Sequence, residues 1–84
     1  MTTDSIVLVR YFAGARVAAG CSEEKFAAAT LGDLVQMIGA RHGDRLAAVL
    51  RASSFLVDGL AIHDRSMPLP EGASIDVIPP FAGG

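Results

Sequence analysis

The hydrophobic positions along this chain follow two different periods, which predicts an α+β protein built from strands and helices. Residues 6–12 are nearly continuous in apolar, β-branched and aromatic side chains, a pattern typical of a strand buried on both faces in mid-sheet. Residues 13–20 are small and alanine-rich, and they favour a short helix closed by Gly20. Residues 23–29 predict a second strand around Phe26, paired as a hairpin with the first.

The next segment has the pattern of an amphipathic helix. Thr30 is a suitable N-cap, and Asp33 follows three residues later in a weaker form of the capping box. Apolar side chains then recur at the spacing of one helix face, at Leu31, Leu34, Val35 and Ile38. Gly43 suits the C′ position that ends this helix. A shorter second helix is indicated by Leu46, Val49 and Leu50.

The last third of the chain predicts three more strands. Asp58-Gly59 lies between two short apolar runs and favours the type I′ turn of a β-hairpin. Prolines exclude a regular central strand in residues 66–70. Apolar and polar positions alternate over residues 73–78, which predicts the final strand.

The resulting order of strand, strand, helix, strand, strand, strand fits the β-grasp, or ubiquitin-like, architecture. In that arrangement one main helix packs on one face of a single mixed sheet. The helical crossover allows the first and last strands to lie side by side and parallel. We therefore expect a single β-grasp domain over residues 1–80, followed by a flexible C-terminal diglycine tail at residues 81–84.

Composition and charge narrow the classes of partner. The net charge of −2 and the absence of a basic stripe argue against nucleic acid. No apolar run approaches the roughly 18 residues of a membrane-spanning helix, so no membrane partner is expected. The first residues lack the pattern of a signal peptide, and the single cysteine fits a cytoplasmic protein.

The sequence contains no recognisable catalytic constellation. Ser53-Ser54 has no evident histidine and aspartate partners for nucleophilic catalysis. No glycine pattern matches a phosphate-binding loop, so we expect the chain to bind no cofactor of its own.

The groups that could bind a metal or act as a nucleophile are few. Cys21, His42 and His63 do not form a metal-ligand spacing, so no metal is expected, although the three could converge in space. We interpret Glu23 and Glu24 as part of a solvated turn. Acidic neighbours raise the pKa of a thiol, which opposes a role for Cys21 as an activated nucleophile.

The sequence ends in Gly83-Gly84, preceded by Phe81 and Ala82. Glycine lets a backbone approach another molecule closely, so such a tail can thread into a narrow active site. Its carboxyl group, with a pKa of about 3.5, is ionised and must be activated before it can react. Adenylation would achieve this, and the ATP must be used by a partner protein because this chain lacks a phosphate cradle. Phe81 fits either the core or an anchor that faces the partner.

With these features, the sequence resembles the MoaD/ThiS family of ubiquitin-like sulfur carriers. Within that family it is most similar to the MoaD branch. The resemblance covers almost the whole chain. It is most specific at residues 78–84, whose sequence Ile-Pro-Pro-Phe-Ala-Gly-Gly is close to the family's Pro-Pro-x-x-Gly-Gly ending. Further matches lie in residues 9–13, 30–34, 57–59 and 68–73. Phe81 stands where a smaller residue is common in the MoaD branch. This difference bears on which partner protein the chain serves and not on the chemistry of the tail.

The resemblance implies a non-catalytic, sulfur-carrying small subunit of a molybdopterin synthase. Gly84 would be adenylated by a MoeB-like adenylyltransferase and converted to a thiocarboxylate with sulfur from a cysteine desulfurase or rhodanese. A MoaE-like large subunit would then use this sulfur in molybdenum cofactor biosynthesis. Gly83 and Ala82 would form the stalk that threads into the partner, and Phe81 and Ile78 would lie at the base of the docking surface.

Three alternatives stay open at this point. A carrier of the same fold can deliver sulfur for thiamine-thiazole or cysteine biosynthesis. A ubiquitin-like modifier would instead join Gly84 to a lysine through an isopeptide bond. A plain β-grasp interaction module would use neither reaction.

Overall fold

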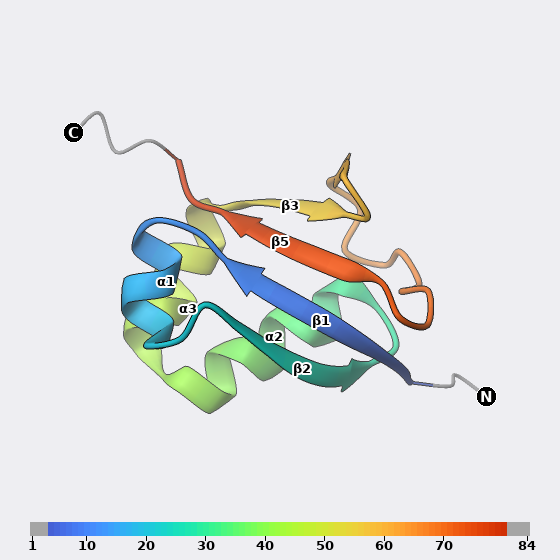
Figure 1. Cartoon of the computed structure of the whole chain (residues 1–84), viewed down its shortest axis with the longest axis horizontal. Coiled ribbons are helices and arrows are strands. Elements are labelled where there is room, and N and C mark those ends of the chain that lie inside the picture. Colours follow the sequence, from blue (N-terminus) through green and yellow to red (C-terminus); the bar gives the residue numbers. More distant parts are fainter. Residues whose placement is uncertain (1–3, 81–84) are drawn as a thin grey trace.

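A five-stranded mixed sheet forms one layer of the computed structural model, which describes residues 4–80, and the helices lie behind it (Figure 1). The strands are β1 (Ser5–Tyr11), β2 (Glu23–Ala28), β3 (Ser54–Val57), β4 (Leu60–Ile62) and β5 (Ser74–Ile78). The helices are α1 (Gly14–Ala19), α2 (Leu31–His42) and α3 (Asp44–Ala52). None of the helices found between residues 4 and 80 has the length and apolarity needed to cross a membrane.

The strand order is β2-β1-β5-β3-β4, so the first and last strands of the chain are neighbours in the middle of the sheet. β1 and β5 run parallel, whereas the other neighbouring pairs are antiparallel. This confirms the predicted α+β class, the β-grasp architecture and the parallel pairing. The division into a domain over residues 1–80 and a tail at residues 81–84 stays a prediction, because both ends lie outside the described residues.

The sheet has one covered face and one open face, and this corrects the prediction for the first strand. Val7, Val9 and Tyr11 of β1 are buried against the helices. On the other face, Ile6 is 48% exposed and Arg10 is also exposed. The apolar run of β1 therefore does not indicate burial on both faces, because the helices that follow it cover only one.

α2 is the main helix, and its sequence signals act as expected. The Thr30 hydroxyl accepts a hydrogen bond from the Asp33 amide at 3.1 Å, which closes the N-terminus. The buried face of the helix consists of Leu31, Leu34 and Ile38. Gly43 ends the helix with φ of 96°, a left-handed value that favours glycine.

The β3–β4 turn forms at Asp58-Gly59, where both residues have positive φ values of 48° and 85° as a type I′ turn requires. Asp58 also ties the turn to the start of β5. Its amide donates to the Ser74 carbonyl and its carboxylate accepts from the Ser74 amide, both at 2.9 Å. The entry of β5 into the sheet is thereby fixed, and the strand delivers its C-terminal end to the opposite side of the molecule (Figure 1).

Candidate functional site

The C-terminal end of β5 is the best candidate site, because it is the last described element before Gly83-Gly84 in the sequence. Val77 lies between Tyr11 of β1 and Phe55 of β3 in the sheet register. The Phe12 amide also donates to the Val77 carbonyl at 3.3 Å. Neighbours on both sides therefore hold the strand up to Val77, and Ser54 of β3 pairs with Ile78, where the pattern predicted that the strand would end. Pro79 and Pro80 follow, and their fixed φ angles limit the directions that the chain can take.

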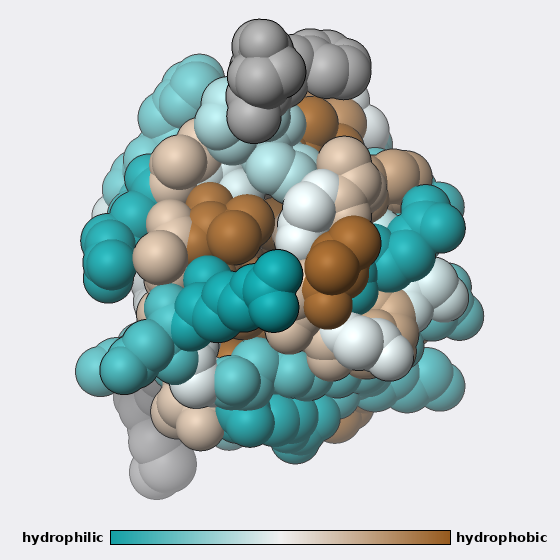
Figure 2. All heavy atoms as spheres, turned by 90° about the vertical axis from the view of Figure 1, so that its left-hand side faces the viewer, coloured by the Kyte–Doolittle hydropathy of each residue, from teal (hydrophilic) through white to brown (hydrophobic). Residues whose placement is uncertain are grey.

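A groove of about 580 Å³ opens beside this strand end. Its walls come from the β1–α1 junction, the C-terminal half of α3 and the end of β5. The lining residues are Phe12, Ala13, Gly14, Val49, Ala52, Ile78, Pro79 and Pro80, none of which carries a charge. Figure 2 views this end of the molecule and shows apolar side chains exposed between hydrophilic ones.

Within the part of the chain that the structure describes, the groove contains one of the site residues predicted from the sequence. Ile78 is half-buried and lines the groove, which agrees with its predicted place near a docking surface. Phe81, Ala82, Gly83 and Gly84 lie outside the described residues, so their predicted roles stay predictions.

Sequence reasoning missed the other walls of the groove. Phe12, Val49 and Ala52 come from segments far apart in the chain, and each fits an ordinary strand or helix pattern. The structure itself marks this wall at Ala13, which adopts φ of 50° and ψ of −127° at the N-cap of α1, a feature that the sequence does not show. An alanine in this glycine-favouring region is strained, and such strain often accompanies a functional surface.

A second group of polar side chains lies where β2 begins and α2 ends. Glu24 is its centre, and it corrects the interpretation of Glu23-Glu24 as a solvated turn. Glu24 lies within β2, and its side chain is only 17% exposed. It shares the helix-facing side of the strand with Phe26 and Ala28, as the period of two predicts once residues 23–28 are known to be a strand.

The Glu24 carboxylate accepts hydrogen bonds from three side chains. Nε2 of His42 is 2.7 Å from Oε1 and 3.0 Å from Oε2. The Tyr11 hydroxyl donates to Oε1 at 3.2 Å, and the Cys21 thiol donates to Oε2 at 3.3 Å. Burial favours the neutral form of Glu24, but the bonds from His42, Cys21 and Tyr11 outweigh it and lower the pKa of this carboxyl.

The same contacts make Cys21 a weak nucleophile. Burial, together with the hydrogen bond to Glu24 and the charge of that residue, raises the pKa of the Cys21 thiol. The direction agrees with the sequence prediction, although burial of the thiol is the largest cause and the contributing carboxylate is largely buried instead of solvated.

Cys21 and His42 do converge in space, as the sequence left open, and the expectation that no metal binds stays a prediction. Together with Glu24 they form the one group of three or more possible metal ligands among residues 4–80, and the ligand atoms lie within 4.8 Å of one another. His63 is not part of this group. We call Cys21, Glu24 and His42 the β2–α2 cluster.

Comparison with known proteins places these features in a family. A family model described as the ThiS family matches residues 9–84. Comparison with curated proteins finds no match.

Several solved structures share the fold. A protein from Pyrococcus furiosus, described as a candidate molybdopterin converting factor subunit 1, is 25% identical with a TM-score of 0.77, over 92% of this chain and 99% of that one. A chain in the complex of subunits 1 and 2 of the molybdopterin-converting factor from Helicobacter pylori is 23% identical with a TM-score of 0.71, over 94% of this chain and 99% of that one. Small archaeal modifier protein 1 from Methanosarcina acetivorans is 18% identical with a TM-score of 0.83, over 96% of this chain and 98% of that one. The last two likenesses are evidence for the fold alone.

Proposed function

We propose that this chain, which belongs to the ThiS family, is a sulfur carrier. In this proposal the Gly84 carboxyl group holds the sulfur as a thiocarboxylate. The observation that carries the proposal is structural. β5 is held between β1 and β3 up to Val77, and an uncharged groove opens beside the end of this strand. A partner can dock on the rigid domain while the last residues enter its active site.

The chemistry requires a partner enzyme. A carboxylate is a poor electrophile, so its oxygen first attacks the α-phosphate of ATP and releases pyrophosphate. The terminal sulfur of a persulfide on the donor protein then displaces AMP from the acyl-adenylate. Reduction of the remaining sulfur–sulfur bond by a thiol frees the thiocarboxylate. The sequence contains no phosphate-binding loop, so a MoeB-like adenylyltransferase supplies the nucleotide site.

The length of residues 81–84 suits a mechanism in which the partner enzyme provides the active site and this chain provides the carboxyl group. Four residues follow Pro80, and a fully extended segment of that length reaches about 14 Å. Glycine at both of the last positions keeps the end of the segment narrow. We infer that Gly83 and Ala82 form the stalk and that Phe81 and Ile78 contribute to the docking surface at its base.

We assign the acceptor to molybdopterin synthesis in the cytoplasm, with a MoaE-like large subunit as the stable partner. The 25% identity to the Pyrococcus furiosus protein supports this branch. The Helicobacter pylori structure, in which subunit 1 is complexed with subunit 2, supports the choice of partner. Sulfur delivery for thiazole or cysteine synthesis is the alternative within the family.

Pyrophosphate exchange with a MoeB-like enzyme tests the proposal. Wild-type protein should stimulate exchange of label between pyrophosphate and ATP. Gly83→Val places a branched side chain on the stalk, and a form extended beyond Gly84 removes the free carboxylate, so both should fail. Exchange at the wild-type rate with both altered forms would show that Gly84 does not enter the active site.

A further inference from the structure

The β2–α2 cluster brings one sulfur, one carboxylate and one imidazole together between β2 and the end of α2, and none of the three has a role in the proposed sulfur chemistry. Cys21 lies just before β2, Glu24 lies within that strand, and His42 is the last residue of α2. Glu24 and His42 are largely buried, with side-chain exposures of 17% and 15%. The register of β2 against β1 and the packing of α2 under β2 fix the positions of these side chains.

We propose that the β2–α2 cluster is a binding site for Zn²⁺, with Cys21 Sγ, Glu24 Oε2 and His42 Nε2 as ligands and water in the fourth position. These three donor types are the ones that zinc takes in proteins. A tetrahedral site with bonds of about 2.0–2.3 Å places its ligand atoms roughly 3.3–3.8 Å apart. In the structure, Sγ of Cys21 is 3.3 Å from Oε2, and Nε2 of His42 is 3.0 Å from the same oxygen. Two of the three ligand pairs are therefore close to the required spacing, and all three ligand atoms lie within 4.8 Å of one another.

The two oxygens of Glu24 share His42 and differ in their other neighbours. Nε2 of His42 is 2.7 Å from Oε1 and 3.0 Å from Oε2. Oε2 also accepts from the Cys21 thiol, whereas Oε1 accepts from the Tyr11 hydroxyl at 3.2 Å and lies 3.7 Å from the Arg41 guanidinium. Tyr11 is buried and its ring lies edge-on to that of His42 at 6.0 Å. Tyr11 thus orients both the carboxylate and the imidazole, which is the role of outer-shell groups around zinc.

The charges and protons of the cluster balance with zinc bound. The Cys21 thiol loses its proton to solvent, and the thiolate sulfur forms a bond to the metal. His42 binds through Nε2 with its remaining proton on Nδ1, so a protonated His42 also releases one proton to solvent. A thiolate and a carboxylate neutralise the two charges of Zn²⁺. The nearby Arg41 therefore faces a neutral site, and it is exposed and held over the Phe26 ring at 4.3 Å.

Cobalt(II) titration of the full-length protein tests the site, because tetrahedral cobalt with a thiolate ligand has a characteristic charge-transfer band. Cys21 is the single cysteine, so such a band reports on this residue alone. We expect one equivalent of cobalt to produce the band and one equivalent of zinc to abolish it. Zinc should also raise the melting temperature, because it binds only the folded cluster.

Variants separate a metal site from a simple hydrogen-bond cluster. Cys21→Ser should remove the band, and His42→Gln should weaken zinc binding in a chelator competition, whereas the matched control His63→Gln should bind as wild type does. Tyr11→Phe should keep the band and weaken binding by about 10–100-fold. Circular dichroism confirms that each variant is folded. Absence of the band in the wild type, or equal losses with His42→Gln and His63→Gln, would overturn the proposal.

Discussion

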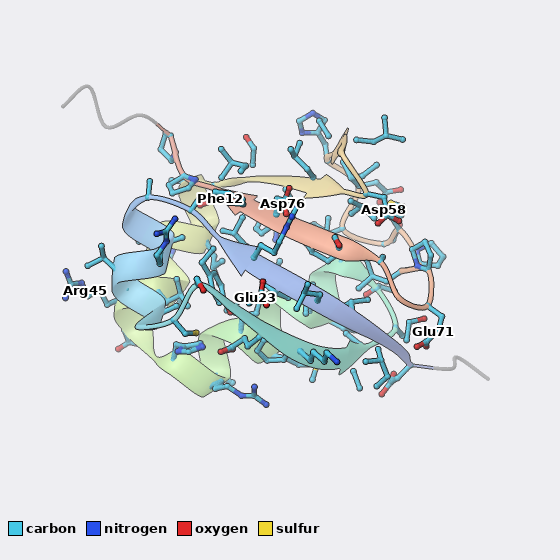
Figure 3. All side chains as sticks on the ribbon, in the orientation of Figure 1. Phe12, Glu23, Arg45, Asp58, Glu71 and Asp76 are labelled. Atoms are coloured by element: carbon cyan, nitrogen blue, oxygen red, sulfur yellow. The ribbon has the colours of Figure 1, made fainter. Side chains whose placement is uncertain are left out.

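Arg10 and Asp76 form a bidentate ion pair that joins β1 to β5 on the open face of the sheet (Figure 3). Nε of Arg10 donates to Oδ1 of Asp76 at 2.6 Å, and Nη2 donates to Oδ2 at 2.9 Å. The two residues are also direct partners in the parallel register. Because β5 positions the proposed sulfur-carrying end, this pair helps to hold the base of the functional segment in the sheet.

The two partners of this pair should differ in their contribution to stability. The side chain of Asp76 is 10% exposed, whereas that of Arg10 is 46% exposed. Arg10→Gln leaves a buried carboxylate without a counter-charge, but Asp76→Asn leaves an arginine that water can solvate. We therefore expect Arg10→Gln to lower the melting temperature by several degrees and by more than Asp76→Asn does. Equal losses, or the reverse order, in thermal unfolding would contradict this.

Ala13 offers a test of backbone strain at the edge of the groove. Its φ of 50° and ψ of −127° suit glycine and cost an alanine about 1–3 kcal/mol. Ala13→Gly should therefore raise the free energy of unfolding by about 1 kcal/mol, even after the entropy lost by a glycine. The same change at Ala18, within α1, should lower it by a similar amount. Denaturant unfolding of both variants measures the difference, and a loss of stability in both would rule out strain at Ala13.

The lowered pKa of Glu24 predicts how stability depends on pH. A carboxyl whose folded pKa lies below its unfolded value of about 4.3 stabilises the fold above that pH, and its contribution is lost as the pH falls through the folded pKa. In metal-free protein, Glu24→Gln should cost about 1–2 kcal/mol at pH 7, and the cost should shrink below about pH 4.

The exposed neighbour Glu23 provides the matched control for this prediction. Glu23→Gln should change the free energy of unfolding by less than about 0.5 kcal/mol at either pH. Urea unfolding at the two pH values measures both variants. A cost of Glu24→Gln that stays constant with pH would mean that the carboxylate charge does not stabilise this cluster.

The groove prediction can be tested with two exposed alanines. Ala52 lines the groove at the end of α3, whereas Ala61 lies on the edge strand β4. Lysine is depleted at the centre of protein interfaces. Ala52→Lys should weaken binding to a MoaE-like subunit at least about tenfold, the loss expected near a hot spot, whereas Ala61→Lys should have little effect. Calorimetric titration gives both affinities, and similar values for the two variants would exclude the groove as the docking surface.

The local patterns of the sequence were sufficient to predict the strands, the main helix and the sheet topology, because each of these elements has its own sequence signals. Thr30 and Gly43 bound the main helix, and Asp58-Gly59 specifies the hairpin turn. Burial across layers was less predictable. The apolar Ile6 lies on the open face of the sheet although it belongs to the same run as buried Val7.

The candidate sites were predictable only in part, for the same physical reason. Ile78 was recognised because it belongs to the Ile-Pro-Pro-Phe-Ala-Gly-Gly sequence of residues 78–84, but Phe12 and Ala52 reach the groove only through tertiary packing. Glu24 and His42 are 18 residues apart, and their contact depends on how α2 packs under β2. Such a contact leaves no periodic trace in the sequence.

Intact-mass spectrometry tests the central claim most directly. Purified protein is incubated with a MoeB-like enzyme, ATP, a persulfide donor and a thiol reductant, beside a form that lacks Gly83 and Gly84. We predict that the wild type gains the mass that corresponds to replacement of one oxygen by sulfur, that fragmentation places the sulfur on Gly84, and that the truncated form gains none. A wild type that gains no sulfur, sulfur that also appears on the truncated form, or lysine-linked adducts in place of the thiocarboxylate would contradict the account.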